Sequence, residues 1–132
     1  MENKLPYLID LEAKRNSKPG ALVMLEKSTI GFDVKRIFYI YGLSDDPSKN
    51  SRGNHGHTNT IQFLICLSGS VDIETIFKED QTKLNFKLHS PEKGLMLLPN
   101  NYIAMTNFSK DAILMVVCDT EFKDEISYQT VK

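Results

Sequence analysis

Two histidines that stand two positions apart are the residues of this sequence best suited to acid–base chemistry. His55 and His57 lie in the segment 51–57, which reads SRGNHGH, and the chain has only one other histidine. In an extended strand, residues two apart point to the same face and lie about 6.6 Å apart at ~3.3 Å per residue. An imidazole ionises near neutral pH, so either ring could take up and return a proton. We therefore predict that His55 and His57 project together from one strand.

Two glycines beside the histidines predict a special backbone. Gly56 stands between His55 and His57 and leaves room above the backbone for something bulky. Gly53 permits a φ angle that other residues resist.

Arginine is scarce in this chain, so the position of each arginine carries information. Thirteen lysines accompany only three arginines, Arg15, Arg36 and Arg52. A guanidinium offers a planar fork that matches phosphate and carboxylate groups bidentately, which an ammonium does not. Arg52 stands three residues before His55. We expect Arg52 or Arg36 to bind an anionic group. For Arg36, an ion pair on the protein surface is an equally good interpretation.

The elements that must position these residues are short strands. Apolar runs recur between turn signals at regular spacing, which predicts an all-β sandwich or barrel. The runs cover residues 21–25, 34–41, 61–67, 71–77, 84–88, 95–98 and 112–118. No window of ten or more residues shows the period of a helix, although residues 121–125 could form one helical turn.

Two of these runs predict how their strands are exposed. Residues 83–89 alternate between polar and apolar side chains, which indicates a strand with one wet face and places His89 on that face. Residues 37–41 are apolar at every position, which predicts a strand covered on both sides.

Length, composition and charge narrow the class of protein. The chain has 132 residues, of which 41% are hydrophobic and 25% charged, so we expect a single domain over residues 1–132 rather than a disordered chain. A net charge of −1 argues against nucleic acid as a partner. No apolar run reaches the ~20 residues that span a bilayer, and no secretory signal is present, so we expect a cytoplasmic protein. Cys66 and Cys118 lie inside apolar runs and are predicted to be buried thiols.

The histidine segment resembles a known motif. Gly53, His55 and His57, followed by Gln62 and Gly69, look like the first sequence motif of the cupins, which are small jelly rolls. In metal-binding cupins these two histidines, a glutamate and a further histidine from a second motif bind the metal. Here Gln62 replaces the glutamate, and the second motif, residues 94–105, has no histidine. We therefore predict a cupin-type jelly roll, or double-stranded β-helix, with no metal and no cofactor.

A closer resemblance covers most of the chain. Residues 32–40, 52–57, 62–70 and 107–117 are similar to the dTDP-4-keto-6-deoxyglucose 3,4-ketoisomerases, which are metal-free cupins of the WxcM-like group. The resemblance implies an isomerase that moves a keto group from C4 to C3 of a dTDP-linked sugar. It also implies a homodimer, and a product used for a 3-amino-3,6-dideoxysugar of a bacterial surface polysaccharide such as O-antigen lipopolysaccharide.

The same resemblance implies roles for individual residues. The first histidine of the pair, His55, corresponds to the family's catalytic base, and the carbonyl shift passes through an enediolate whose oxygens need hydrogen-bond donors. The expected catalytic residues are His55, His57 and Tyr39. The expected substrate-binding residues are Arg52, Gln62, Arg36, Tyr102 and Asn54.

Two places depart from the family's pattern, and both are expected near the sugar. Residues 17–20 read Ser-Lys-Pro-Gly where family members commonly carry an arginine, and Tyr102 and Ile103 stand where Trp-His is common. Three alternatives therefore stay open: a non-catalytic cupin that binds a sugar or nucleotide, a metal-dependent cupin enzyme, and a dTDP-sugar epimerase.

Overall fold

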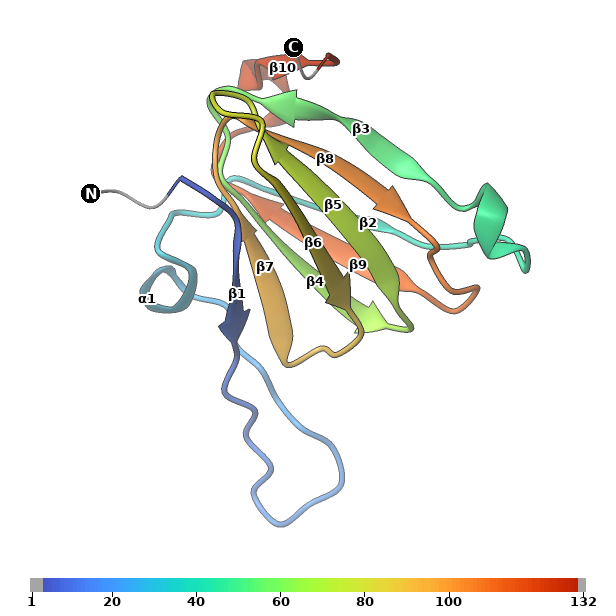
Figure 1. The fold of residues 1–132 in the computed structure, drawn as a ribbon. Coiled ribbons are helices and arrows are strands. Elements are labelled where there is room, and N and C mark those ends of the chain that lie inside the picture. The colour runs from blue at the N-terminus through green and yellow to red at the C-terminus, as the bar shows by residue number, and fades with distance from the viewer. Residues whose placement is uncertain (1–3, 131–132) are drawn as a thin grey trace.

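The computed structural model describes residues 4–130, which form two five-stranded antiparallel sheets packed face to face (Figure 1). The first sheet has the strand order β1-β7-β4-β9-β2, and the second has the order β10-β3-β8-β5-β6. The strands are β1 (Tyr7–Asp10), β2 (Arg36–Ile40), β3 (Arg52–His57), β4 (Gln62–Ser68), β5 (Val71–Phe77), β6 (Lys83–Leu88), β7 (Lys93–Leu97), β8 (Asn101–Thr106), β9 (Ile113–Cys118) and β10 (Ser127–Tyr128). The predicted all-β fold is confirmed.

Helical structure is limited to single turns. The helix α1 (Lys27–Ile30) and the 3-10 turns η1 (Pro47–Lys49) and η2 (Phe122–Asp124) connect strands. The turn η2 falls inside residues 121–125, where the sequence predicted a helical turn. Within residues 4–130, no helix has the length and apolar character needed to cross a membrane.

The main core fills the space between the sheets. Strands place alternate side chains on opposite faces, and β5 follows this rule with Val71, Ile73 and Phe77 buried. Leu64 and Leu114 of the first sheet pack in the same cluster as Val71 and Ile73. The two cysteines are buried and free, as predicted.

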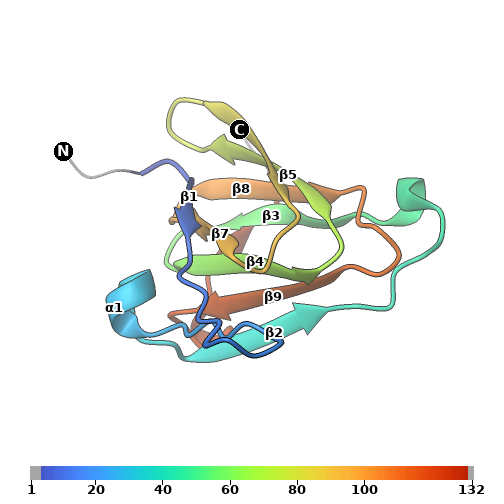
Figure 2. The same cartoon turned by 90° about the horizontal axis from the view of Figure 1, so that it is seen from below.

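A second core covers the outer face of the first sheet. Phe63 and Ile65 point outward from β4 and pack against Ile30 and Phe32 of the segment around α1. Figure 2 shows α1 and this segment beside the first sheet. Strand β4 is therefore buried on both faces, which explains its unbroken apolar sequence.

Strand β2 differs from its prediction. Its apolar sequence predicted cover on both sides, but β2 is an edge strand whose outward side chains are open to solvent. Ile37 and Tyr39 are 58% and 62% exposed, and Tyr41, just beyond the strand, is 70% exposed. The segment around α1 reaches the outer face of β4 and β9 but does not extend over β2.

The N-terminal third contains the other differences. The strand predicted at residues 21–25 is wrong, because only Leu22 forms a bridge, with Lys14, while Val23 and Leu25 pack on the outer core. Residues 11–26 form a loop whose ends pack on the outer core and whose tip stands away from the sheets (Figure 1). Strand β1 was not among the predicted runs, and neither were β8 and β10 later in the chain.

Removal of Leu114 tests which face of β9 is the core. Leu114 is fully buried between the sheets, so Leu114→Ala should lower the free energy of unfolding by about 2–5 kcal/mol. The neighbouring Ile113 is exposed on the same strand, and Ile113→Ala should cost less than about 1 kcal/mol. Urea unfolding of both variants measures the difference, and equal losses would contradict the described packing.

Candidate active site

A bulge in β3 aims two candidate residues into the same space. Arg52 pairs with Met105 of β8 and His55 pairs with Ile103, with a register shift between Gly53 and His55. Residues three apart in a regular strand point to opposite faces, but one extra residue restores them to the same face. The extra residue is Asn54, with φ 63°, and it follows Gly53 at φ 90°.

Gly53 is required by its surroundings as well as by its φ angle. A Cβ atom at Gly53 would lie 2.9 Å from the carbonyl oxygen of Ile103. The glycine therefore lets β3 approach β8 closely at the bulge, in addition to adopting the unusual φ angle that the sequence predicted.

The two histidines meet as predicted. Their ring centroids lie 4.7 Å apart with the planes inclined at 65°, so the rings touch edge to face. His57 is only 5% exposed, whereas His55 is half-buried.

Both histidines border cavities at the open side between β2 and β3. A cavity of about 200 Å³ and one of about 410 Å³ share Phe38, His55 and Gln62 as lining residues. The smaller cavity is also lined by Arg52, Ile103 and Met105, and the larger by Arg36, His57, Phe122 and Glu125. An apolar wall therefore faces a small group of polar side chains, as in many ligand sites.

Arg36 is held in a partly buried ion pair. Its Nη2 atom donates to Oε1 of Glu125 at 2.7 Å and to Sγ of Cys118 at 3.3 Å. Burial opposes the positive charge, but these two hydrogen bonds outweigh it and raise the pKa of Arg36. The guanidinium carbon also lies 5.5 Å from the ring centroid of Phe38.

Burial keeps His57 neutral. Desolvation lowers the pKa of His57 to about 4, although the carboxylate of Glu125 opposes this shift. His55 and Arg36 add to the lowering, because each disfavours a second positive charge nearby. His57 therefore has an uncharged imidazole at neutral pH.

The Cys118 thiol is also neutral. Burial raises the pKa of Cys118, and the hydrogen bond from Arg36 only partly opposes this. Nε2 of Gln62 lies 3.5 Å from the same sulfur atom and donates to it.

The space above Gly56 is filled by the C-terminus of the described chain. A Cβ atom at Gly56 would lie 2.3 Å from the ring of Tyr128, so the glycine makes room for this ring. The bulky group that the sequence predicted there is thus a side chain of the protein itself.

Three of the expected site residues direct their side chains to the outer faces of the sheets. Tyr39 borders the smaller cavity on β2, but its register beside Met115 places its side chain on the exposed outer face, against Tyr41. Tyr102 and Asn54 lie on the outer face of the second sheet, where the Tyr102 hydroxyl donates to Oδ1 of Asn54 at a long 3.5 Å.

Of the two places that depart from the family's pattern, one lies away from both cavities and the other lines the smaller one. Lys18 and its neighbours lie at the tip of the loop 11–26 and line neither cavity. Ile103 lines the smaller cavity opposite His55.

Sequence reasoning missed Glu125. This carboxylate comes from the segment after η2, far along the chain from His57, and no motif or periodicity marks it. Sequence reasoning also missed Met105, which could have been found because it alternates with polar or small residues along β8.

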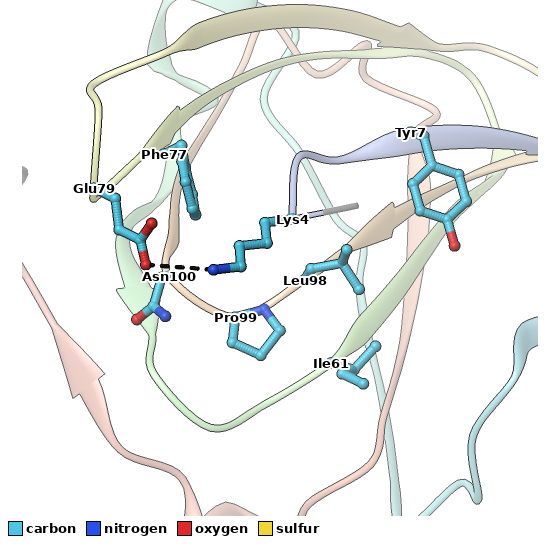
Figure 3. Close-up of a pocket in the computed structure, with 8 residues that line it drawn as sticks. All are labelled: Lys4, Tyr7, Ile61, Phe77, Glu79, Leu98, Pro99 and Asn100. Carbon is cyan, nitrogen blue, oxygen red and sulfur yellow. Dashed lines mark ion pairs between the residues drawn. The ribbon is translucent and has the colours of Figure 1, made fainter. Parts of the chain in front are cut away.

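A third hollow lies apart from the histidines. It has a volume of about 540 Å³ at the end of the sandwich (Figure 3). Lys4 and Glu79 form an exposed ion pair of 3.9 Å across it. Its lining residues are Lys4, Tyr7, Ile61, Phe77, Glu79, Leu98, Pro99 and Asn100.

Metal ligation needs several donors at one point. Among residues 4–130, no three histidine, cysteine, aspartate or glutamate side chains gather in a group that could hold a metal ion.

A family model described as "FdtA: WxcM-like, C-terminal" matches residues 4–130. The chain belongs to this family. The TDP-4-oxo-6-deoxy-alpha-D-glucose-3,4-oxoisomerase of Aneurinibacillus thermoaerophilus is 31% identical over 128 residues, which cover 97% of this chain and 86% of the relative. The resemblance stated from the sequence is thus confirmed.

Solved structures of the FdtA family's relatives agree with the fold. The WlaRB TDP-quinovose 3,4-ketoisomerase of Campylobacter jejuni has a TM-score of 0.86 at 31% identity, over 97% of this chain and 95% of that one. A histidine-to-asparagine mutant of the 3,4-ketoisomerase QdtA from Thermoanaerobacterium thermosaccharolyticum, in complex with TDP-4-keto-6-deoxyglucose, has a TM-score of 0.85 at 28% identity. That match covers 98% of this chain and 90% of the mutant's. The predicted cupin-type jelly roll is confirmed.

The neutral, buried state of His57 predicts a pH dependence of stability. The pKa of His57 is about 4 when folded and about 6.5 when unfolded, so the unfolded chain binds the proton first as the pH falls. Stability should therefore be lost between about pH 6.5 and 4, by up to ~3 kcal/mol.

The variant His57→Asn should not lose stability in this pH range through protonation of residue 57. We expect the stability difference between the wild type and His57→Asn to shrink as the pH falls through this window, measured by urea unfolding at several pH values. His89→Asn, at an exposed position, is the control and should run parallel to the wild type. A His57→Asn curve that also runs parallel would contradict the neutral state.

Proposed function

We propose that this protein is a TDP-sugar 3,4-ketoisomerase that converts TDP-4-keto-6-deoxyglucose (written dTDP above) to a TDP-3-keto-6-deoxyhexose. The observation that carries this proposal is that His55, in ring contact with His57, lines a cavity together with Arg52 and Gln62, in a chain of the FdtA family. Relatives at 31% identity carry this activity in their names.

The proposed reaction moves hydrogen without a net change in composition. His55 takes the proton from C3, and the electron pair of that C–H bond forms the C3–C4 double bond of an enediolate while the C4 carbonyl becomes a C–O⁻ group. The enediolate collapses to a C3 carbonyl as O3 loses its hydroxyl proton, C4 receives a proton from His55, and O4 takes a proton. A histidine near neutrality can perform both halves of this transfer.

Hydrogen-bond donors at the cavity wall would stabilise the enediolate. Gln62 borders both cavities, and its amide donates to the sulfur of Cys118, a weak acceptor that a substrate oxygen could replace. His57 touches His55 and offers a neutral ring. Tyr39 would serve only if its side chain turned from the outer face.

The nucleotide needs a cation, and Arg52 is the best placed of the three arginines. Arg15 and Arg36 pair with Glu92 and Glu125, whereas the Arg52 side chain has no ion pair or hydrogen bond within residues 4–130. Arg52 also borders the smaller cavity, so we propose that it binds the diphosphate. Arg36 keeps Nε and Nη1 without a hydrogen-bond partner in the described chain and could make a second contact.

Replacement of His55 tests the function directly. The variant His55→Asn keeps a polar group of similar bulk but removes the base, so kcat should fall by about 10²–10⁴-fold while the affinity for the TDP-sugar changes far less. Conversion of TDP-4-keto-6-deoxyglucose is followed by NMR, in the presence of a chelator, because no metal is expected to take part.

The exposed His89 supplies the control. His89→Asn should turn over like the wild type. Near wild-type turnover by His55→Asn would refute the assignment of the base, and binding without turnover by the wild type would favour the non-catalytic cupin.

We also propose that the protein forms a homodimer in which a second copy covers the outer face of β2. An unpaired edge strand with exposed apolar side chains is a common pairing surface. Ile37, Tyr39 and Tyr41 provide that surface, and Leu22 and Met24 are exposed on the loop 11–26.

The dimer is tested by light scattering after size-exclusion chromatography. The wild type should be a dimer, and Ile37→Lys should shift it toward the monomer. Asn85→Lys adds the same charge to the exposed face of β6, the edge strand at the far side of the second sheet, and should leave the dimer intact. A monomeric wild type at micromolar concentration would contradict the proposal.

The metabolic use of the product follows from its chemistry. We infer that the product is a cytoplasmic precursor of a 3-amino-3,6-dideoxysugar for a surface polysaccharide, because a 3-keto group is what an aminotransferase requires. Neighbouring genes for an aminotransferase and an acyltransferase would support this, and their absence from the genome would contradict it.

A further inference from the structure

We propose that Glu125 is a positioning residue for the reaction: its carboxylate, held by Arg36, orients the His57 ring. This inference rests on the proposed function and adds a residue that sequence motifs do not mark.

One oxygen atom of the Glu125 carboxylate lies close to two side chains. Oε1 of Glu125 accepts a hydrogen bond from Nη2 of Arg36 at 2.7 Å and lies 3.2 Å from Nε2 of His57. The His57 ring is not yet aligned to donate, and both of its nitrogens lack a hydrogen-bond partner among the described residues. At 3.2 Å, a small rotation of the ring is enough for Nε2–H to donate to the carboxylate, and such contacts often tighten when substrate binds.

The chain holds Glu125 in place from both sides. Asn59 donates from Nδ2 to the carbonyl oxygen of Asp124 at 2.7 Å and accepts from the amide of Ile126 at 2.9 Å. The Asn59 side chain therefore forms hydrogen bonds with the residues on both sides of Glu125. The amide of Thr58 also donates to the carbonyl of Ile126.

Strand β10 continues the same attachment. It pairs with the end of β3, with Ser127 opposite His57 and Tyr128 opposite Gly56 (Figure 1). The segment that carries Glu125 is thus fixed to the strand that carries both histidines.

This arrangement selects one tautomer of His57. A carboxylate accepts hydrogen bonds but cannot donate one, so it favours the form of His57 that carries its proton on Nε2. Nδ1 is then left with a free electron pair that can accept a hydrogen bond from His55 or from a substrate hydroxyl. The hydrogen bond from Arg36 keeps the carboxylate from turning away.

The charges around His57 define the expected pH effect. The groups that face it are Glu125, His55 and Arg36, and only the carboxylate raises its pKa. Loss of that carboxylate should therefore lower the pKa of His57 further and shift any acid limb due to His57 in the pH–rate profile to lower pH.

The test replaces the carboxylate by an amide of the same shape. Glu125→Gln should lower kcat by about 10- to 100-fold, the usual effect of removing a group that orients a histidine, with little change in KM. Imidazole ¹⁵N NMR of the protein with TDP bound should show a protected Nε2–H proton of His57 in the wild type and its loss or faster exchange in Glu125→Gln. Glu121→Gln removes the same charge from an exposed side chain four residues earlier and should behave like the wild type.

Two further variants keep the test decisive if Glu125→Gln folds poorly. Asn59→Asp leaves Glu125 and its charge in place but removes the donor to Asp124, and it should slow turnover less than Glu125→Gln. The double variant Arg36→Met with Glu125→Met removes both charges together, so that no unpaired charge stays buried. It should fold, yet still lack the protected proton of His57.

The outcomes separate this inference from the proposed function. A protected Nε2–H proton that persists in either folded variant without the carboxylate, or Glu125→Gln turnover within about threefold of the wild type, would overturn the role of Glu125. A wild type that shows this proton but does not convert the TDP-sugar would refute the proposed function and leave the Glu125–His57 contact intact.

Discussion

Polar side chains that are buried between two apolar sheets must be either neutral or paired, and this requirement shapes the interior of the molecule. Isolated charges cost several kcal/mol in such surroundings. His57 meets the requirement by staying neutral, and Cys118 does so as a thiol. Arg36 meets it by pairing with Glu125. The result is a group of polar side chains in which Arg36 is paired and His57 and Cys118 are neutral, while His55 and Arg52 border the smaller cavity.

The backbone decides which side chains join this group. The bulge at Asn54 turns Arg52 to the same face as His55, and Gly53 lets the bulge sit close to β8. Without the bulge the arginine would point to the outer face. The C-terminal segment then adds Glu125 from the far end of the chain, so that the cavity is bordered by parts of β2, β3, β4, β8 and the residues after η2.

The sequence was sufficient for properties that depend on local spacing. The alternation in β6 and the contact of His55 with His57 follow from a period of two, and Gln62 was correctly expected beside the histidines in the motif. Properties that depend on strand register, or on which distant segments fold back to contact each other, could not be predicted from local spacing. The outward direction of Tyr39 depends on its pairing with Met115, and an apolar edge strand has the same composition as a covered one. Glu125 reaches His57 only through tertiary folding.

The central claim is that the two histidines transfer a proton from one carbon atom to the next of a sugar that is bound in the cavity. The most direct measurement follows TDP-4-keto-6-deoxyglucose by ¹H and ¹³C NMR in D₂O with the chelator-treated wild-type protein. The account predicts that the carbonyl signal moves from C4 to C3 and that solvent deuterium enters at C4 of the product, because a proton held on a histidine exchanges with water. A sugar that binds, as shown by line broadening, but keeps its C4 carbonyl and its C3 hydrogen would contradict the account.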